Sequence, residues 1–492
     1  MKPDVDVHHL HPAFFMFAGI KMNNKTLNQI QQHLADGKLT AVSLTESYLG
    51  KITEHQSLNA FLEVFEADAI AQAKAIDAKI AAGQPLGRLH GLVIGIKDNI
   101  CYKGHKVSAG SKILENFTSI YSSTVVEKLL AADAIIIGRL NCDEFAMGSS
   151  NENSAYGPVR NALDPTRVPG GSSGGSAVAV QAGLCHASLG SDTGGSIRQP
   201  ASFCGVVGVK PTYGRVSRYG LIAYASSFDQ IGPFANSVED AALITSVISG
   251  ADDYDATASQ KSVEAFEKET WTGKARIAVL KNTIDHPGLH PEVRTAAENV
   301  INNWKLQGHI IEEVPFDLMD HLIATYYVLT TAEASSNLAR FDGVHYGFRA
   351  PDAVDMETVY KRSRTEGFGR EVKNRIMLGT FVLSAGYYDA YYSRAQRVRR
   401  ILQNKLREIF KSYDFILMPT APSVAFKLGE KTSDPVEMYL ADIYTVLANL
   451  TGVPAISLPL AKNAEGLPIG MQLLADQFQE GKLFAFSKQV MP

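Results

Sequence analysis

The centre of this 492-residue chain contains two runs of glycine and serine, Pro169-Gly170-Gly171-Ser172-Ser173-Gly174-Gly175-Ser176 and Gly190-Ser191-Asp192-Thr193-Gly194-Gly195-Ser196. Such a composition is typical of flexible linkers. Here, however, residues 177–182 have the pattern of a small-residue helix, and residues 206–209 form an apolar run. The two glycine- and serine-rich runs therefore belong to a folded domain, in which glycine lets the backbone approach a ligand closely.

Apolar runs on both sides of this centre predict a sheet. Residues 92–96 and 134–137 are typical of strands buried on both faces, and residues 125–130 between them have a helical pattern. Further strands are predicted at 277–280, 310–311, 415–418, 455–458 and 469–473. Alternation of strands and helices predicts an α/β fold whose sheet is covered by helices.

Helical patterns dominate residues 319–412, but predicted strands precede and follow this segment. We therefore expect one interleaved domain over 22–492. Residues 1–21 carry three histidines and a short apolar run after an acidic start, so we expect a disordered extension rather than a signal peptide. Helices are also predicted near 27–34, from 40 onward, at 66–82 and at 238–249. A capping box of Ser237 and Asp240 begins the last of these.

The composition limits the classes of function. The formal net charge is −4, whereas a protein that holds RNA alone is more often basic. The four cysteines form no CxxC pair and no metal site is evident, which suits a reducing cytoplasm. No apolar run reaches the roughly 18 residues that a membrane span requires. We expect a cytoplasmic protein that binds neither metal nor membrane.

Acyl transfer fits the glycine-rich centre better than nucleotide binding does. A Walker loop requires a lysine that is absent after Gly174-Gly175, and the fingerprint G-x-G-x-x-G is absent as well. Amide cleavage requires a nucleophile, a base and donors for an oxyanion, and the tight turn at 193–196 offers N–H groups beside a hydroxyl. His186 lies in an apolar stretch and is predicted to be a core histidine, not the base.

Three segments together resemble the amidase signature family. They are residues 170–176, residues 192–200, and Gly95-Ile96-Lys97-Asp98-Asn99 at the end of a predicted strand. Ser172 and Ser196 lie 24 positions apart, as in that family's motif. The resemblance implies the amidase signature fold, in which a central mixed β-sheet has helices on both faces.

The resemblance also implies a role for each catalytic residue. Ser196 is the nucleophile, Ser172 relays its proton and follows a cis peptide bond, and Lys97 is the base. A lysine that follows a buried strand is poorly solvated, which lowers its pKa toward the range of a base. The N–H groups of Thr193, Gly194 and Gly195, together with that of Ser196, are implied to form the oxyanion hole.

Neighbouring polar residues have simpler interpretations. Ser173 and Ser176 are predicted to be turn or helix-cap groups. Asp192 and Arg198 are predicted to form a structural ion pair that brackets the turn. Cys204 is a rival nucleophile, but nothing basic in the sequence is placed to activate it.

The segments at 143–157, 210–220 and 333–340 are similar to one branch of the family, the A subunits of aspartyl/glutamyl-tRNA amidotransferases. This branch implies a glutaminase. Arg375 and Asp442 occupy the positions that bind the α-carboxylate and the α-ammonium of glutamine. Residues Met147, Gly148 and Ser149 would line the pocket with backbone groups.

The same branch implies partners, the B and C subunits of an amidotransferase. The B subunit would hold ATP, Mg²⁺ and misacylated Glu-tRNA(Gln), with the small C subunit as tether, while this chain carries no cofactor. Whether Asp-tRNA(Asn) is a second substrate stays open. The alternatives are a stand-alone amidase for small or aryl amides and an inactive scaffold. Five arginines on one predicted helix either contact RNA or form a solvated face. They are Arg394, Arg397, Arg399, Arg400 and Arg407.

Overall fold

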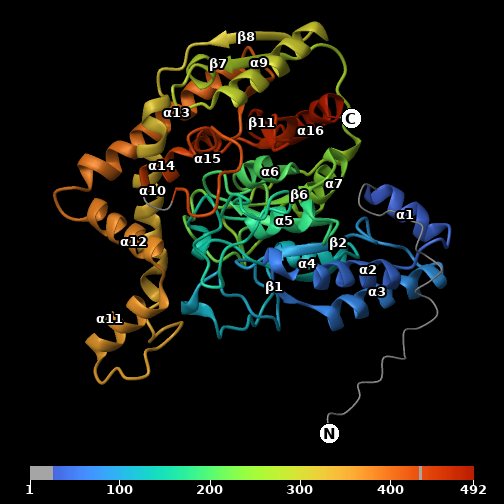
Figure 1. The fold of residues 1–492 in the computed structure, drawn as a ribbon, viewed down its shortest axis with the longest axis horizontal. Helices are drawn as coiled ribbons and strands as arrows, with labels where there is room; N and C mark the ends of the chain where they lie inside the picture. The colour runs from blue at the N-terminus through green and yellow to red at the C-terminus, as the bar shows by residue number, and fades with distance from the viewer. Residues whose placement is uncertain (1–25, 432–434, 492) are drawn as a thin grey trace.

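The computed structural model describes residues 26–431 and 435–491, so the extension expected at 1–21 lies outside the described range (Figure 1). Its centre is one sheet in the order β1-β3-β2-β4-β6-β5-β10-β11-β9-β7-β8. The pairs β2–β3, β2–β4, β7–β8 and β7–β9 are parallel, and the other pairs are antiparallel. The sheet is therefore mixed, as expected.

The strands are β1 (Phe61–Val64), β2 (Val93–Lys97), β3 (Ile135–Leu140), β4 (Ala187–Asp192), β5 (Val207–Lys210), β6 (Gln230–Ala235), β7 (Arg276–Leu280), β8 (Ile310–Val314), β9 (Phe415–Pro419), β10 (Ala455–Lys462) and β11 (Pro468–Leu474). All seven strands predicted from apolar runs are confirmed. No apolar run marks β1, β4 or β6, because β1 is a short edge strand, β4 is built of small and polar residues, and β6 contains Pro233.

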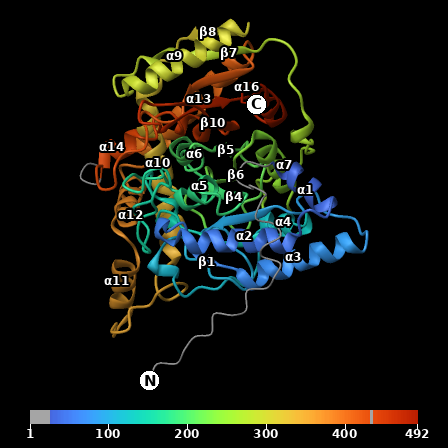
Figure 2. The same cartoon turned by 45° about the vertical axis from the view of Figure 1, so that its right-hand side comes forward.

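The helices are α1 (Leu27–Ala35), α2 (Ala41–Glu54), α3 (Glu66–Ala81), α4 (Thr124–Ala131), α5 (Gly174–Gln181), α6 (Arg198–Cys204), α7 (Val238–Ile248), α8 (Lys281–Ile284), α9 (Pro291–Leu306), α10 (Met319–Asn337), α11 (Met356–Gly367), α12 (Arg370–Leu383), α13 (Arg394–Phe410), α14 (Pro435–Leu440), α15 (Val446–Thr451) and α16 (Glu480–Val490). Helices α10 to α13 lie together at one side of the molecule (Figures 1 and 2). No helix in the described ranges has the length and apolar character needed to cross a membrane.

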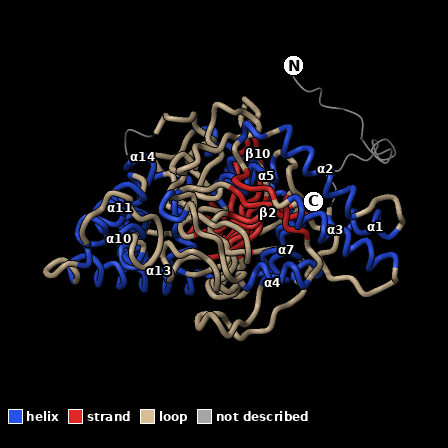
Figure 3. The backbone as a smooth tube through the Cα atoms, turned by 90° about the horizontal axis from the view of Figure 1, so that it is seen from below, coloured by secondary structure: helices blue, strands red, loops and turns tan. Residues whose placement is uncertain are grey.

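Successive side chains of each strand point to opposite faces of the sheet, and helices cover both faces. Figure 3 shows these helices around the central strands. In β2, Val93 packs with residues of α2, α3 and α5. Ile94 and Ile96 point the other way and pack with α4, α7 and α16. In β9, Ile416 and Met418 pack with α10, α13 and α15. The predicted α/β fold with two helical layers is confirmed.

One of the two hydrogen bonds of the capping box predicted for α7 is present. Ser237 Oγ accepts a hydrogen bond from the Asp240 N–H at 3.1 Å. The Asp240 carboxylate does not return to Ser237, because it accepts the Leu27 N–H at 3.0 Å and lies 2.9 Å from His186 Nε2. His186 is buried and satisfied in this way, so its interpretation as a core histidine is confirmed.

Gly379 lets α12 pack directly on α10. A Cβ atom at this position would lie 1.9 Å from the Thr331 carbonyl oxygen. We expect Gly379→Ala to lower the free energy of unfolding by about 1–3 kcal/mol, because one helix must move away from the other. Gly50 in α2 has open space around it, so Gly50→Ala is the control and should stabilise by about 0.5–1 kcal/mol. Equal thermal unfolding midpoints for the two variants would contradict this packing.

Candidate active site

Lys97 is the last residue of β2 and is fully buried. Its Nζ donates hydrogen bonds to three serine hydroxyls, Ser172 at 2.7 Å, Ser173 at 2.9 Å and Ser191 at 3.0 Å. No carboxylate among the described residues forms an ion pair with it. Burial lowers the pKa of Lys97 to about 8. About a tenth of this amine is therefore unprotonated at pH 7, and about half at pH 8.

Two of the three hydroxyls have further hydrogen bonds. Ser173 Oγ donates to the Ser191 carbonyl oxygen at 3.1 Å, and Asn99 Nδ2 donates to Ser191 Oγ at 2.9 Å. The Ser172 hydroxyl donates to no described residue. Its proton is therefore free to move toward Lys97 once the amine is unprotonated.

The prediction for Ser173 and Ser176 holds in part, because Ser173 lies in a bend at the N-cap position of α5, but neither serine side chain makes a capping hydrogen bond. Ser173 lies in the hydrogen-bond shell of Lys97, and Ser176 Oγ donates to the Leu189 carbonyl oxygen in β4 at 3.0 Å. The sequence placed both serines in a turn but did not show that β4 runs beside it. The peptide bond Gly171–Ser172 is cis, as expected.

Ser196 lies in the turn between β4 and α6, and 7% of its surface is exposed. The Ser173 N–H donates to the Ser196 carbonyl oxygen at 3.2 Å, so the two serine-rich runs are in contact. Within the described chain, Ser196 Oγ makes no hydrogen bond, either to Ser172 or to another residue. The structure thus joins Lys97 to Ser172 directly and places Ser196 beside them with its hydroxyl unpartnered.

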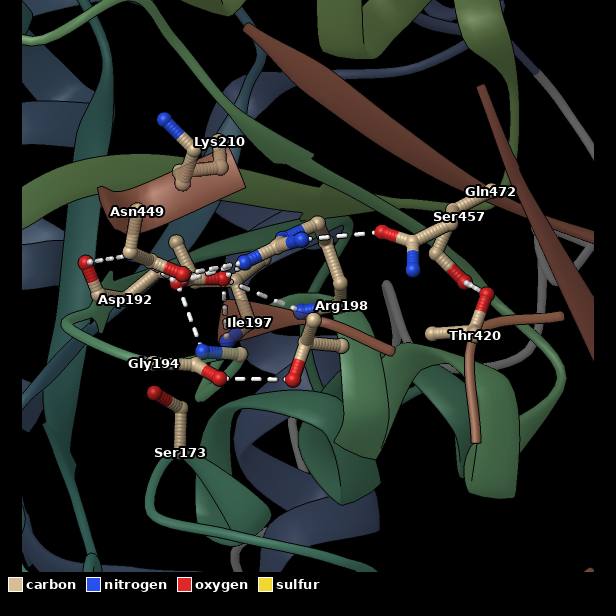
Figure 4. Close-up of polar contacts among 12 residues, drawn as sticks. Ser173, Asp192, Gly194, Ile197, Arg198, Lys210, Thr420, Asn449, Ser457 and Gln472 are labelled. Atoms are coloured by element: carbon tan, nitrogen blue, oxygen red, sulfur yellow. Dashed lines mark hydrogen bonds and ion pairs between the residues drawn. The ribbon is translucent and has the colours of Figure 1, made fainter. Parts of the chain in front are cut away.

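The Asp192 carboxylate organises this turn (Figure 4). It accepts the N–H groups of Gly195 at 2.8 Å and Ile197 at 3.2 Å, and the Arg198 side chain at 3.1 Å. Burial alone would raise the pKa of Asp192, but the Arg198 guanidinium outweighs it and holds the pKa at about 2. The predicted structural ion pair is confirmed. Asn449 Nδ2 adds a further hydrogen bond to Asp192 at 2.8 Å.

This hydrogen bonding removes Gly195 from the N–H groups that were expected to bind the oxyanion. The Gly195 N–H is occupied by Asp192, so in this structure it is not free for a substrate oxygen. The N–H groups of Thr193, Gly194 and Ser196 donate to none of the described residues. Thr445 Oγ1 donates to the Gly194 carbonyl oxygen at 2.6 Å and holds the turn from the opposite side.

Arg375 is buried on α12 and surrounded by three tyrosine rings. Its guanidinium carbon lies 5.5 Å from the ring centre of Tyr224, 5.2 Å from that of Tyr327 and 5.7 Å from that of Tyr439. Nε donates to Glu371 at 2.7 Å, and one terminal nitrogen donates to the Tyr224 hydroxyl at 2.8 Å. The remaining guanidinium N–H groups are free to bind an anion.

Asp442 also contacts Tyr327. It accepts hydrogen bonds from Ser149 Oγ at 2.8 Å and from the Tyr327 hydroxyl at 3.5 Å. Burial raises the pKa of Asp442 to about 7, and a cationic ligand would stabilise its ionised form. A cationic and an anionic side chain from distant segments therefore meet at one tyrosine.

A cavity of about 200 Å³ lies beside these residues, and Gly148, Arg375 and Tyr439 line part of it. Ser149, which follows Gly148, is held by Gln199 Nε2, a donor to its carbonyl oxygen at 2.8 Å. Ser196 does not line this cavity. Met147 is fully buried in the apolar core, so its side chain is not a pocket wall.

Cys204 is buried, which raises the pKa of its thiol, and its Sγ donates only to the Pro169 carbonyl oxygen at 3.4 Å. It has no base beside it. Over the described ranges, no group of three or more His, Cys, Asp or Glu is placed to hold a metal ion. The sequence did not single out Tyr224, Tyr327 or Tyr439, because nothing in their spacing indicates that they converge on Arg375.

The geometry defines an enzyme of the amide-hydrolysing class, and the family model described as Amidase matches residues 43–484. The chain belongs to this amidase family, as its resemblance predicted. It is 53% identical over 474 residues to the A subunit of the glutamyl-tRNA(Gln) amidotransferase of Koribacter versatilis, and the match covers 95% of this chain and 98% of that protein.

Two further relatives have the same description. The A subunit from Chlorobium phaeobacteroides is 50% identical over 469 residues, covering 95% of this chain and 98% of that protein. The crystal structure of the A subunit of the glutamyl-tRNA(Gln) amidotransferase from Thermotoga maritima matches with a TM-score of 0.77 at 40% identity, over 95% of this chain and 94% of that chain. The implied amidase signature fold is thus confirmed.

Lys97 sets an expected pH dependence. If the unprotonated amine is the base, kcat/KM for amide hydrolysis should rise with pH and level off above about 8, the pKa of Lys97. Lys97→Arg should lose activity by about 10³-fold or more, because a guanidinium does not release its proton in this range. Initial rates between pH 6 and 10 measure the profile. A flat profile between pH 7 and 9 would contradict a lysine base.

Proposed function

We propose that this chain is a glutaminase that releases ammonia from glutamine for an amidotransferase. The observation that carries the proposal is the convergence of Arg375 and Asp442 on Tyr327, beside the turn that holds Ser196. Free glutamine has an α-carboxylate and an α-ammonium, which match a guanidinium and a carboxylate. A small neutral amide carries no charged group that this pair could bind.

The first half of the reaction forms an acyl-enzyme. Ser196 Oγ attacks the side-chain carbonyl carbon of glutamine and passes its proton to Ser172 Oγ. The Ser172 proton moves to Lys97 Nζ, so the relay ends on the buried amine. The N–H groups of Thr193, Gly194 and Ser196 stabilise the oxyanion, which is usually the largest electrostatic contribution to such a reaction.

The second half restores the enzyme. The proton held by Lys97 returns through Ser172 to the departing nitrogen, and ammonia leaves as the carbon–nitrogen bond breaks. Water then attacks the ester and gives a proton to the same relay. The relay returns this proton to Ser196 Oγ as the ester bond breaks, and glutamate leaves. In each half of the reaction the relay accepts one proton and returns one, and no cofactor of this chain takes part.

The names of the relatives suggest the destination of the ammonia. We infer that a partner B subunit binds ATP, Mg²⁺ and Glu-tRNA(Gln), and that a small C subunit tethers the two. The assembly is expected in the cytoplasm. The net charge of −4 supports this division of labour, because tRNA binding by this chain alone would favour a basic surface.

The nucleophile is tested by Ser196→Ala. Removal of the attacking oxygen should lower kcat for glutamine hydrolysis by about 10⁴-fold or more without lowering the thermal unfolding midpoint. Ser176→Ala is the matched control from the neighbouring serine run, since Ser176 bonds only β4. Ammonia release by Ser196→Ala at the wild-type rate would rule out this nucleophile.

The substrate is tested by Arg375→Ala. Loss of the guanidinium that binds the α-carboxylate should raise KM for glutamine by about 10–100-fold. Hydrolysis of a small uncharged amide such as propionamide should not slow. Arg362→Ala is the control, because Arg362 pairs with Glu366 on the surface of α11. An unchanged KM for glutamine would favour the alternative function, a stand-alone amidase for small or aryl amides.

A further inference from the structure

The outer face of α12 and the turn after it expose an unusual number of apolar and aromatic side chains. Met377 is 63% exposed, Leu378 40% and Phe381 42%, and their spacing puts them on one face of α12. Tyr387 and Tyr391 continue this surface, with ring centres 4.4 Å and 5.8 Å from that of Phe381. These five residues are called the α12 patch below.

The α12 patch is larger than the single exposed apolar residues that a soluble surface normally carries. It belongs to the helical side of the molecule, where the chain between α12 and α13 projects from the body (Figure 1). Opposite the patch, Gly379 and Arg375 face the protein interior. The described residues pack against the inner face of α12 and leave the outer face uncovered.

Positive charge borders the α12 patch. Arg394 and Arg397 are exposed at the start of α13, directly after Tyr391, and Arg400 follows one turn later. None of these three forms an ion pair with a described residue. Arg399 is different, because it donates to the Leu450 carbonyl oxygen and lies 4.1 Å from the Phe228 ring centre. Of the five arginines, Arg399 is therefore internal and Arg394, Arg397 and Arg400 are exposed beside the patch, whereas Arg407 is exposed near the other end of α13.

We propose that the α12 patch, with Arg394 and Arg397, is the docking surface for a protein partner that presents apolar side chains flanked by Asp or Glu. This inference rests on the proposed function, which requires a partner protein. Methionine, aromatic residues and arginine are enriched at protein interfaces, and unpaired arginines favour an acidic counterpart.

A protein fits this surface better than RNA does. Single-stranded RNA binds where basic groups follow its backbone and aromatic faces stack on its bases. Here Met377 and Leu378 are aliphatic, and Phe381, Tyr387 and Tyr391 already lie against one another. Because α12 also carries Arg375, a partner on the outer face contacts the helix that supplies the glutamine-binding arginine.

The test measures binding of the full-length chain to the purified partner proteins of the amidotransferase. Phe381→Glu and the pair Arg394→Glu/Arg397→Glu should each weaken this binding by about tenfold or more. Tyr254 is 75% exposed elsewhere on the surface, so Tyr254→Glu is the control and should bind within about twofold of wild type. Thermal unfolding midpoints show whether each variant is folded.

A photo-crosslinking residue in place of Leu378 locates the partner directly, and we expect crosslinks to an apolar segment with acidic neighbours. Wild-type binding by both patch variants would overturn the proposal. So would loss of tRNA binding with intact binding of the partner proteins, or loss of self-association of the isolated chain. Glutamine hydrolysis by the isolated wild-type chain is measured separately, so failure of the glutaminase proposal is distinguished from failure of the docking surface.

Discussion

The proposed catalytic centre depends on a buried amine that forms no ion pair with a described residue. Lys97 is surrounded by hydroxyl groups, which satisfy its N–H groups without stabilising the ammonium as strongly as a carboxylate would. Three acids, Asp143, Asp192 and Asp229, lie close enough to raise the pKa of Lys97. Burial outweighs these acids, so the pKa of Lys97 is lowered overall to about 8.

An arginine offsets the charge of one of these acids. Asp192 is ionised, but Arg198 lies against it and offsets its charge. Asp143 and Asp229 form no ion pair with a described residue, and burial raises their pKa values to about 7 and about 6, so both acids are largely ionised at the pH where Lys97 loses its proton. A buried ion pair is costly unless its remaining groups are bonded, and Gln472 and Asn449 from the C-terminal strand and helix complete the shell of Arg198. The electrostatics of Lys97 thus depend on distant parts of the chain.

The sequence could predict features that local patterns encode, but not contacts between distant parts of the chain. Continuous apolar runs identified seven strands, because burial on both faces favours such runs, although the edge strand β8 is largely exposed. The pairing of Lys97 with Ser172 was predicted from the family motifs. Strand β4 was not predicted, because most of its residues are small or polar. The tyrosines around Arg375 and the capture of the Gly195 N–H by Asp192 are tertiary contacts, and no local pattern encodes them.

Asp143 holds the loop before Ser172 and the loop around Ser149 at a fixed distance from each other. Its carboxylate accepts the N–H groups of Asn151 and Asn153 at 2.9 and 3.0 Å. A Cβ atom at Gly148 would lie 2.3 Å from its carboxyl carbon, and one at Gly171 would lie 2.1 Å from a carboxylate oxygen. Gly171 precedes Ser172, the proposed relay serine, and Gly148 precedes Ser149, which bonds Asp442. One carboxylate packed between two glycines therefore fixes the spacing between the proposed proton relay and the proposed substrate pocket.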